Sequence, residues 1–493
     1  MYYISTRGCK EKVTGSKAIV NGLCLDGGLY VPTQFPNLEK KLNKFINLSY
    51  KELCFEVLKL FLDDFTDEEL KTCIDMAYDN KFDTKEISPT KKIGNNYFLE
   101  LYHGPTCAFK DLALTLMPHL LQKSLEKNNI KEEIVILTAT SGDTGKAALE
   151  GFKNLNQIKI IVFFPEDGVS NIQKLQMKTQ DGNNTYVVSI NGNFDDAQSG
   201  VKNIFSDREF NKYLLENNYI LSSANSINIG RLLPQIVYYF YSYFNLVKSK
   251  HINMGDKINF VVPTGNFGNI LAAYYSKLMG LPINKLICAS NENNVLYDFF
   301  TTGRYNKNRT LHLTTSPSMD ILISSNLERL LFEISNRDDI KVNSLISDLN
   351  NKGYYEIGNS MKLNLNDFHG EYATESEVKE NINKVFKENN YLIDTHTSVA
   401  YTAYKKFKEK NKDNTGTVIV STANPYKFSK DVLSSLGEDI NNLDEFDILQ
   451  KLSLKTKTDI PLPIKNLQTS KVLHNRNCEK YDLKEEVKNI LKV

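Results

Sequence analysis

The feature that most constrains the fold is a repeated pattern of short apolar runs, each followed by a loop of small polar residues and a helical pattern. The runs are continuous and rich in β-branched residues, which is typical of parallel strands covered by helices on both faces. The clearest runs are Ile134–Thr138, Ile158–Phe164, Ile258–Val262, Lys285–Ala289 and Thr417–Ser421. The sequence therefore predicts an α/β fold built from open, mainly parallel sheets.

The 493 residues are enough for about three domains. We expect a small, mostly helical N-terminal domain over residues 1–90, because apolar spacing between Leu53 and Tyr78 favours two short helices. Residues 91–390 are expected to form the main α/β domains, with a small domain inserted around 130–230 and a polar insertion at 306–390. Residues 391–493 are expected to supply the last strand and a tail helix with a solvated face.

The charge balance argues against a nucleic-acid partner. Sixty basic residues face fifty-nine acidic ones, and no basic stripe is present to contact phosphates. The longest strongly apolar stretch, Ile236–Val247, is shorter than the roughly 20 residues of a membrane span, so it is interpreted as a core helix and no membrane partner is expected. The start of the chain has no apolar signal region, which favours the cytoplasm. No C-x-x-C or H-x-x-x-H pair is present, and no metal site is expected.

Three loops follow predicted strands, where ligands of α/β sheets bind. They are 138–146 (TATSGDTGK), 263–269 (PTGNFGN) and 421–426 (STANPY). The first fails the Walker A pattern at Thr140 and Ala147, and the second is not a G-x-G-x-x-G fingerprint, so neither predicts a nucleotide site. Both suit a small anion held by backbone N–H groups at a helix start. Taken singly, each loop is also explained as a plain capping turn.

A candidate nucleophile lies in the segment 101–113 (LYHGPTCAFKDLA), where Lys110 sits between an aromatic residue and an apolar helix start. Burial lowers the pKa of a lysine and frees its amine for a Schiff base. The alternative is an ordinary surface lysine in the first turn of a helix.

Together these segments closely resemble the threonine synthase family, which are pyridoxal-phosphate enzymes of the tryptophan-synthase-β fold type (fold type II), in the long-chain branch of yeast and many bacteria. The resemblance runs nearly end to end. The ordered motifs are YISTRG, DGGLYVP, HGPTCAFKD, TATSGDTGKAA, NSINIGR, PTGNFGN, SPSMDILISSNLERLL, DTHTSVAY and STANPYKF.

The resemblance implies conversion of O-phospho-L-homoserine and water to L-threonine and phosphate, with pyridoxal 5′-phosphate as cofactor. It assigns Lys110 to the Schiff base with the cofactor. It places Thr422, within the unit 391–493, against the pyridine nitrogen. The residues implied for the cofactor phosphate are Gly265, Asn266, Phe267, Gly268 and Asn269.

The substrate carries a carboxylate and a phosphate. The resemblance places the carboxylate on Ser141, Gly142, Asp143 and Thr144. For the leaving phosphate we predict Lys146 and Arg231, supported by Asn225, Ser226 and Asn228. Two positions depart from the family pattern: Asp143 stands where shorter-chain relatives carry Asn, and Asn424 stands where the family usually has His.

Two rival hypotheses remain open at this point. A threonine-synthase-like phospho-lyase would release 2-oxobutyrate instead of adding water. A binding protein of the same fold would hold no cofactor. For the enzyme we expect a small-molecule substrate and either a monomer or a homodimer.

Overall fold

A computed structural model describes residues 1–140, 142–166 and 169–493 of the chain. Its largest sheet has six strands in the order β13-β10-β9-β14-β4-β3, and every neighbouring pair except β3–β4 is parallel. The strands are β3 (Thr90–Ile93), β4 (Asn96–Glu100), β9 (Ile258–Pro263), β10 (Ile283–Ser290), β13 (Phe368–Tyr372) and β14 (Thr417–Ser421).

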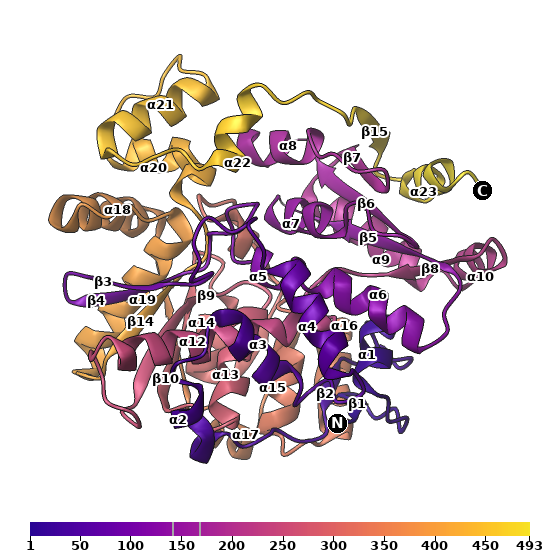
Figure 1. The fold of residues 1–493 in the computed structure, drawn as a ribbon, viewed down its shortest axis with the longest axis horizontal. Helices are drawn as coiled ribbons and strands as arrows, with labels where there is room; N and C mark the ends of the chain where they lie inside the picture. The colour runs from indigo at the N-terminus through magenta and orange to yellow at the C-terminus, as the bar shows by residue number, and fades with distance from the viewer. Residues whose placement is uncertain (141, 167–168) are drawn as a thin grey trace.

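A second sheet has five strands in the order β15-β7-β6-β5-β8, all paired in parallel (Figure 1). These strands are β5 (Glu133–Ala139), β6 (Ile158–Pro165), β7 (Thr185–Asn191), β8 (Tyr219–Ser222) and β15 (Arg476–Glu479). The predicted α/β class with mainly parallel sheets is confirmed.

The continuous apolar runs are explained by burial on both faces. Along β9, Phe260 and Val262 pack into one hydrophobic core, whereas Val261 between them packs into another. Along β5, Ile136 and Leu137 divide between two cores in the same way. Because both faces are covered, no position on these strands calls for a polar side chain.

Helices cover both sheets. Those against the five-stranded sheet are α7 (Asp143–Phe152), α8 (Asn171–Lys178), α9 (Phe194–Ser206), α10 (Arg208–Glu216) and α23 (Leu483–Leu491). Those near the six-stranded sheet are α12 (Pro234–Lys248), α13 (Gly268–Leu278), α14 (Val295–Thr302), α18 (Glu375–Asn389), α19 (Thr395–Asn411), α20 (Ser429–Ser435) and α21 (Glu445–Thr456). Short helices α5 (Asp111–Leu114), α6 (Met117–Lys127) and α11 (Ile229–Leu232) lie between the two groups.

The N-terminal region pairs β1 (Tyr3–Ser5) with β2 (Tyr30–Pro32) and continues with α1 (Gly15–Asn21), α2 (Leu42–Phe45), α3 (Tyr50–Leu58) and α4 (Asp67–Ala77). Capping boxes at Ser49 and Thr66 start the two helices that apolar spacing predicts. The regular structure of this region is mainly helical, and the boundary of an N-terminal domain at residue 90 stays a prediction.

The apolar stretch Ile236–Val247 forms most of α12, which is buried over nearly its whole length. It packs against α3 and α13, so its interpretation as a core helix is confirmed. Among the described residues, no helix has the length and apolar character that crossing a membrane requires.

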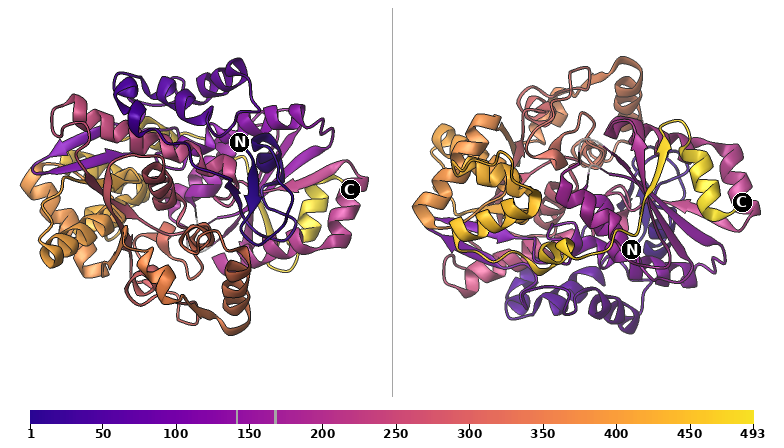
Figure 2. Two further views of the ribbon diagram at one scale, coloured as in Figure 1. Left: turned by 90° about the horizontal axis from the view of Figure 1, so that it is seen from below. Right: turned by 90° about the horizontal axis from the view of Figure 1, so that it is seen from above.

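The sequence prediction missed all four edge strands of the two large sheets, β3, β8, β13 and β15, and the inner strands β4 and β7. β13 and β15 are short and carry no apolar run, because an edge strand has one neighbour and needs less burial. β15 brings the C-terminal tail back to the five-stranded sheet, where α23 buries Leu483 and Val487 against it (Figure 2).

The polar region before residue 390 also contains α15 (Leu327–Ile334), α16 (Asp339–Lys352), α17 (Asn359–Leu363) and the antiparallel pair β11 (Arg304–Asn306) and β12 (Tyr354–Glu356).

Candidate functional site

The segment that carries Lys110 is fastened to the carboxyl end of β14. The backbone N–H of Phe109 donates to the carbonyl oxygen of Thr422 at 2.8 Å, and that of Asn424 donates to Cys107 at 3.0 Å. Two predicted site elements that are 312 positions apart in the chain are therefore neighbours in the fold.

Lys110 is buried, with 7% of its surface exposed. Its Nζ lies 3.3 Å from Asp143 Oδ2 and 3.4 Å from Ser318 Oγ. Burial lowers the pKa of Lys110; Asp143 opposes that shift, while the positive charges of Arg231 and Lys427 add to it. The predicted nucleophile is thus not an ordinary surface lysine, and its amine is biased toward the neutral, reactive form.

The carboxylate of Asp143 lies at the centre of the charged groups around Lys110. It is the first residue of α7, and its Oδ1 accepts from Lys427 at 2.9 Å and from Gln173 at 2.8 Å. Its Oδ2 faces Lys110 and accepts from Ser318 at 3.2 Å. Burial alone would raise the pKa of Asp143, but Lys427 and Lys110 outweigh burial and hold that pKa well below its usual range. The carboxylate is therefore ionised at neutral pH.

The loop after β9 presents a helix N-terminus with no side chain capping it within the described structure. Phe267 adopts a left-handed backbone conformation, with φ of 64°, immediately before α13. Gly265 lies so close to Ser318 that a Cβ would come 2.7 Å from the Ser318 carbonyl oxygen. Backbone N–H groups here are available to an anion, as the sequence predicts for this loop.

Asn269, the second residue of α13, is held in place by two tyrosine hydroxyls. Its Oδ1 accepts from the hydroxyls of Tyr238 and Tyr239, each at 2.6 Å. Its Nδ2 is buried and has no partner among the described residues. A buried donor without an acceptor is costly, so a ligand atom that accepts this bond would fit here.

The loop 138–146 forms a second uncapped helix start, that of α7. Thr140 Oγ1 accepts from the backbone N–H groups of Gly142 and Gly145, each at 2.9 Å, which shapes the turn. Gly142 has a φ of 131°, and a Cβ there would collide with the amide of Gln173. Thr144 is half-buried on the first turn. The prediction for Ser141 lies outside the described residues.

The two predicted phosphate-binding cations differ in their surroundings. Arg231 is 5% exposed and donates through Nη1 to the carbonyl oxygen of Ala224, while its Nε has no partner and no carboxylate pairs with it in the described structure. Burial lowers the pKa of Arg231 to about 10. Lys146 instead pairs with Glu150 at 3.3 Å and donates to Gln180. Arg231 is the cation left for an anionic ligand.

The three predicted residues of the NSINIGR motif occupy different places. Asn225 and Ser226 are half-buried, and Ser226 Oγ accepts from Asn326, whose side chain also bonds to the 263–269 loop. Asn228 is fully buried and donates to the carbonyl oxygen of Ile19 on α1. Asn228 therefore fastens the motif to the N-terminal region.

Sequence reasoning missed Lys427 and Ser318 as site residues. Lys427 lies in the short 3₁₀ helix Pro425–Phe428, where a lysine between aromatic residues was the available signal. Ser318 is held by a backbone bond to His396 Nε2 at 3.2 Å. Asn424 starts this 3₁₀ helix by accepting from the N–H of Tyr426. Its side chain thus has a capping role.

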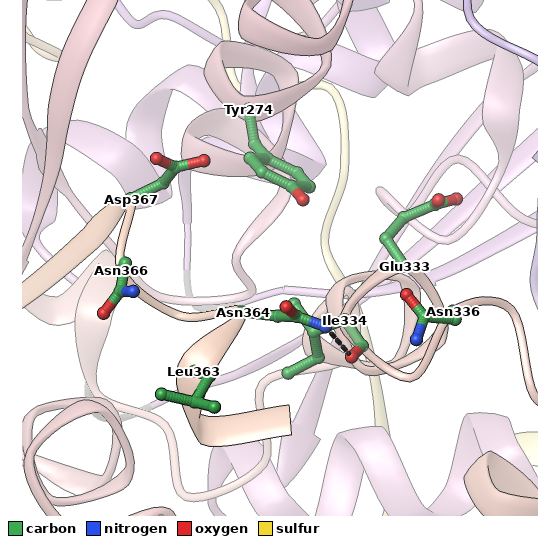
Figure 3. Close-up of a pocket in the computed structure, with 8 residues that line it drawn as sticks. All are labelled: Tyr274, Glu333, Ile334, Asn336, Leu363, Asn364, Asn366 and Asp367. Carbon is green, nitrogen blue, oxygen red and sulfur yellow. Dashed lines mark hydrogen bonds between the residues drawn. The ribbon is translucent and has the colours of Figure 1, made fainter. Parts of the chain in front are cut away.

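A separate polar hollow of about 360 Å³ lies between Tyr274 of α13, the end of α15 and the segment 363–367 (Figure 3). Its carboxylates are already paired, since Glu333 bonds to Arg337 and Asp367 to Lys277. It contains none of the predicted site residues. We therefore take the site around Lys110 as the candidate functional site.

Two family models match the chain. Residues 2–78 match the threonine synthase N terminus, and residues 86–423 match the pyridoxal-phosphate-dependent enzyme family.

Curated relatives agree with these matches. The threonine synthase of Saccharomyces cerevisiae is 36% identical over 487 residues, covering 92% of this chain and 93% of that protein. The human threonine synthase-like 1 is 41% identical over 456 residues, covering 88% of this chain and 60% of that protein. The chain thus spans about 60% of the length of the threonine synthase-like 1 relatives.

Solved structures resemble the whole chain. The crystal structure of PLP-bound threonine synthase from Brucella melitensis has a TM-score of 0.88 at 34% identity and covers 100% of both chains. The yeast threonine synthase structure has a TM-score of 0.88 at 35% identity, covering 100% of this chain and 98% of that one.

Proposed function

Since the chain belongs to the threonine synthase family of pyridoxal-phosphate-dependent enzymes, we propose that it converts O-phospho-L-homoserine and water to L-threonine and phosphate. The observation that carries the proposal is the site itself: a buried lysine with a lowered pKa, close to a guanidinium group that has no carboxylate partner in the part of the chain that the structure describes. Two uncapped helix starts nearby add N–H donors for a substrate and a cofactor that both carry anionic groups.

The residues present fit pyridoxal phosphate. Lys110 would hold its carbonyl carbon, and the N–H groups of 265–269 with the N-terminus of α13 would hold its phosphate. The unpartnered Nδ2 of Asn269 supports an acceptor at this place. Thr422, buried at the end of β14, would present a hydroxyl to the ring nitrogen.

When bound, the cofactor supplies an electrophilic carbonyl and a ring that accepts electron density. A hydroxyl partner stabilises a protonated ring nitrogen less than a carboxylate would, so the choice of Thr422 keeps the ring a moderate electron acceptor. The chain contributes the proton transfers. Lys110, whose pKa is lowered by burial, can take the proton from the substrate Cα and later return one, and a lowered pKa helps the same amine do both.

For the substrate, we propose that the backbone N–H groups of Asp143 and Thr144 bind the carboxylate at the start of α7, since the N–H of Gly142 already donates to Thr140 Oγ1. Arg231 would bind the leaving phosphate, because its charge is not matched by a carboxylate in the described structure. Ser226 would support this end of the site, and Lys146 would contribute less, because Glu150 already pairs with it.

The product assay tests the proposal. The purified protein, loaded with pyridoxal phosphate, is incubated with O-phospho-L-homoserine, and the organic product is identified by mass spectrometry. We expect threonine and inorganic phosphate in equal amounts, and none from Lys110→Ala. Formation of 2-oxobutyrate without threonine would instead identify a phospho-lyase. A protein that takes up no pyridoxal phosphate would identify a binding protein without cofactor.

A further inference from the structure

Asp143 lies between two buried lysines that are held differently. The side chain of Lys427 is 0% exposed, and its Nζ lies 2.9 Å from Asp143 Oδ1, 2.8 Å from the Thr106 carbonyl oxygen and 3.2 Å from Gln176 Oε1. A lysine ammonium group has three N–H donors and no acceptor. The three acceptors in contact with Lys427 therefore match the three donors of an ammonium group.

Lys110 has no comparable set of partners. Its contacts to Asp143 and Ser318 are 3.3 and 3.4 Å long, near the limit of a hydrogen bond, and Ser318 Oγ also bonds to Asp143. The two N–H donors of a neutral amine are enough for the two long contacts of Lys110, whereas the three acceptors around Lys427 call for the three donors of an ammonium group.

The charged groups around Lys110 and Asp143 come from four parts of the fold. Lys110 precedes α5, Asp143 begins α7, Arg231 lies on α11, and Lys427 lies in the 3₁₀ helix Pro425–Phe428. The other nearby carboxyl group, Asp111, bonds to Thr106, and burial raises its pKa to about 6. With both lysines protonated, three cations would share the ionised Asp143 and a weakly acidic Asp111. Deprotonation of one lysine relieves this excess.

We propose that Lys427 is a positioning residue of the proposed active site: its ammonium group neutralises Asp143 and thereby leaves Lys110 as the amine that is free of its proton. Asp143 cannot then serve fully as the counter-ion of Lys110, although it lies beside it. The inference rests on the proposed function only in that Lys110 is the reacting amine.

The test measures the pKa of Lys110 directly. The full-length protein, freed of cofactor with hydroxylamine, is labelled with trace acetic anhydride at a series of pH values, and modification of the Lys110 peptide is quantified by mass spectrometry. In Lys427→Met, the Asp143 charge acts on Lys110 alone, so we expect the pKa of Lys110 to rise by about 1 or more. Lys427→Arg keeps the charge and is expected to leave that pKa near its unaltered value. Lys430→Met, an exposed lysine three residues on, is the matched control and should change nothing.

An unchanged Lys110 pKa in a folded Lys427→Met protein, judged by circular dichroism, would overturn the inference and leave Lys427 a purely structural residue. If Lys427→Met does not fold, Asp143→Asn tests the same pairing from the other side. It removes the carboxylate while Lys427 and Arg231 remain, so we expect the Lys110 pKa to fall below that of the unaltered protein, and an unchanged value contradicts the proposal.

The labelling requires neither substrate nor turnover. Failure to form threonine would therefore overturn the proposed function without changing the labelling result, and a fixed Lys110 pKa would overturn the role of Lys427 while threonine formation persisted.

Discussion

Lys110 and Lys427 are two buried lysines that share one carboxylate, and the structure gives them opposite surroundings. Lys427 contacts three acceptors, two of them within 2.9 Å, and is closed off from solvent. Lys110 keeps slight exposure and contacts Asp143 and Ser318 only at 3.3 and 3.4 Å. Burial is therefore common to both lysines, and they differ in the number and distance of the acceptors that they contact.

The largest expected effect follows from removing the reactive member of the pair. Lys110→Ala removes both the attachment point of the cofactor and the proposed proton carrier, so we expect threonine formation to fall by at least about 10²–10⁴-fold. Steady-state assays with O-phospho-L-homoserine measure the loss. Lys430→Ala, which removes an exposed lysine, is the control and should keep full activity. Residual activity within tenfold of the unaltered enzyme would assign the chemistry to another group.

For the free energy of unfolding, we expect the larger loss from substitution of Lys427 and the smaller loss from substitution of Lys110. Lys427→Met leaves the buried Asp143 without its closest cation and should lower the free energy of unfolding by about 3–5 kcal/mol. Lys110→Met removes a weakly partnered buried amine and should change that free energy by less than about 1 kcal/mol. Urea unfolding of both variants measures the difference. Equal losses would show that the two lysines are held alike.

A second pair of cations, Arg231 and Lys146, extends the comparison to substrate binding. Arg231→Gln removes a buried charge that has no carboxylate partner among the described residues, so we expect KM for O-phospho-L-homoserine to rise by about 10–100-fold, the equivalent of one charged hydrogen bond. Lys146→Gln should raise KM less, because Glu150 already pairs with that amine. A larger rise in KM for Lys146→Gln than for Arg231→Gln would place the leaving phosphate on α7.

The smallest expected effect concerns pH. The folded-state pKa of Asp143 lies below its unfolded value, so its contribution to stability is present above the unfolded pKa of about 4 and is lost as pH falls through the folded pKa. Asp143→Asn should therefore be destabilised at pH 7, with the gap to the unaltered protein narrowing at acidic pH. Thermal unfolding followed between pH 7 and acidic pH measures that gap. A gap that stayed constant would assign the stability to packing.

The sequence predicted the strands and loops around the site better than the contacts between them. Continuous apolar runs identified the buried parallel strands, since burial on both faces excludes polar alternation. β13 and β15 escaped prediction, because short edge strands such as Arg476–Glu479 carry little apolar signal. Motifs identified Lys110 and the 265–269 loop, but the pairing of Asp143 with Lys427, 284 positions away, is created by the tertiary fold.

The measurement that tests this account most directly locates the lysine that reacts with the cofactor. The protein loaded with pyridoxal phosphate is reduced with sodium borohydride, digested and mapped by mass spectrometry. We predict a pyridoxyl group on Lys110 and none on Lys427. A label on Lys427, or the absence of any labelled lysine, would contradict the assignment of Lys110 as the reactive amine.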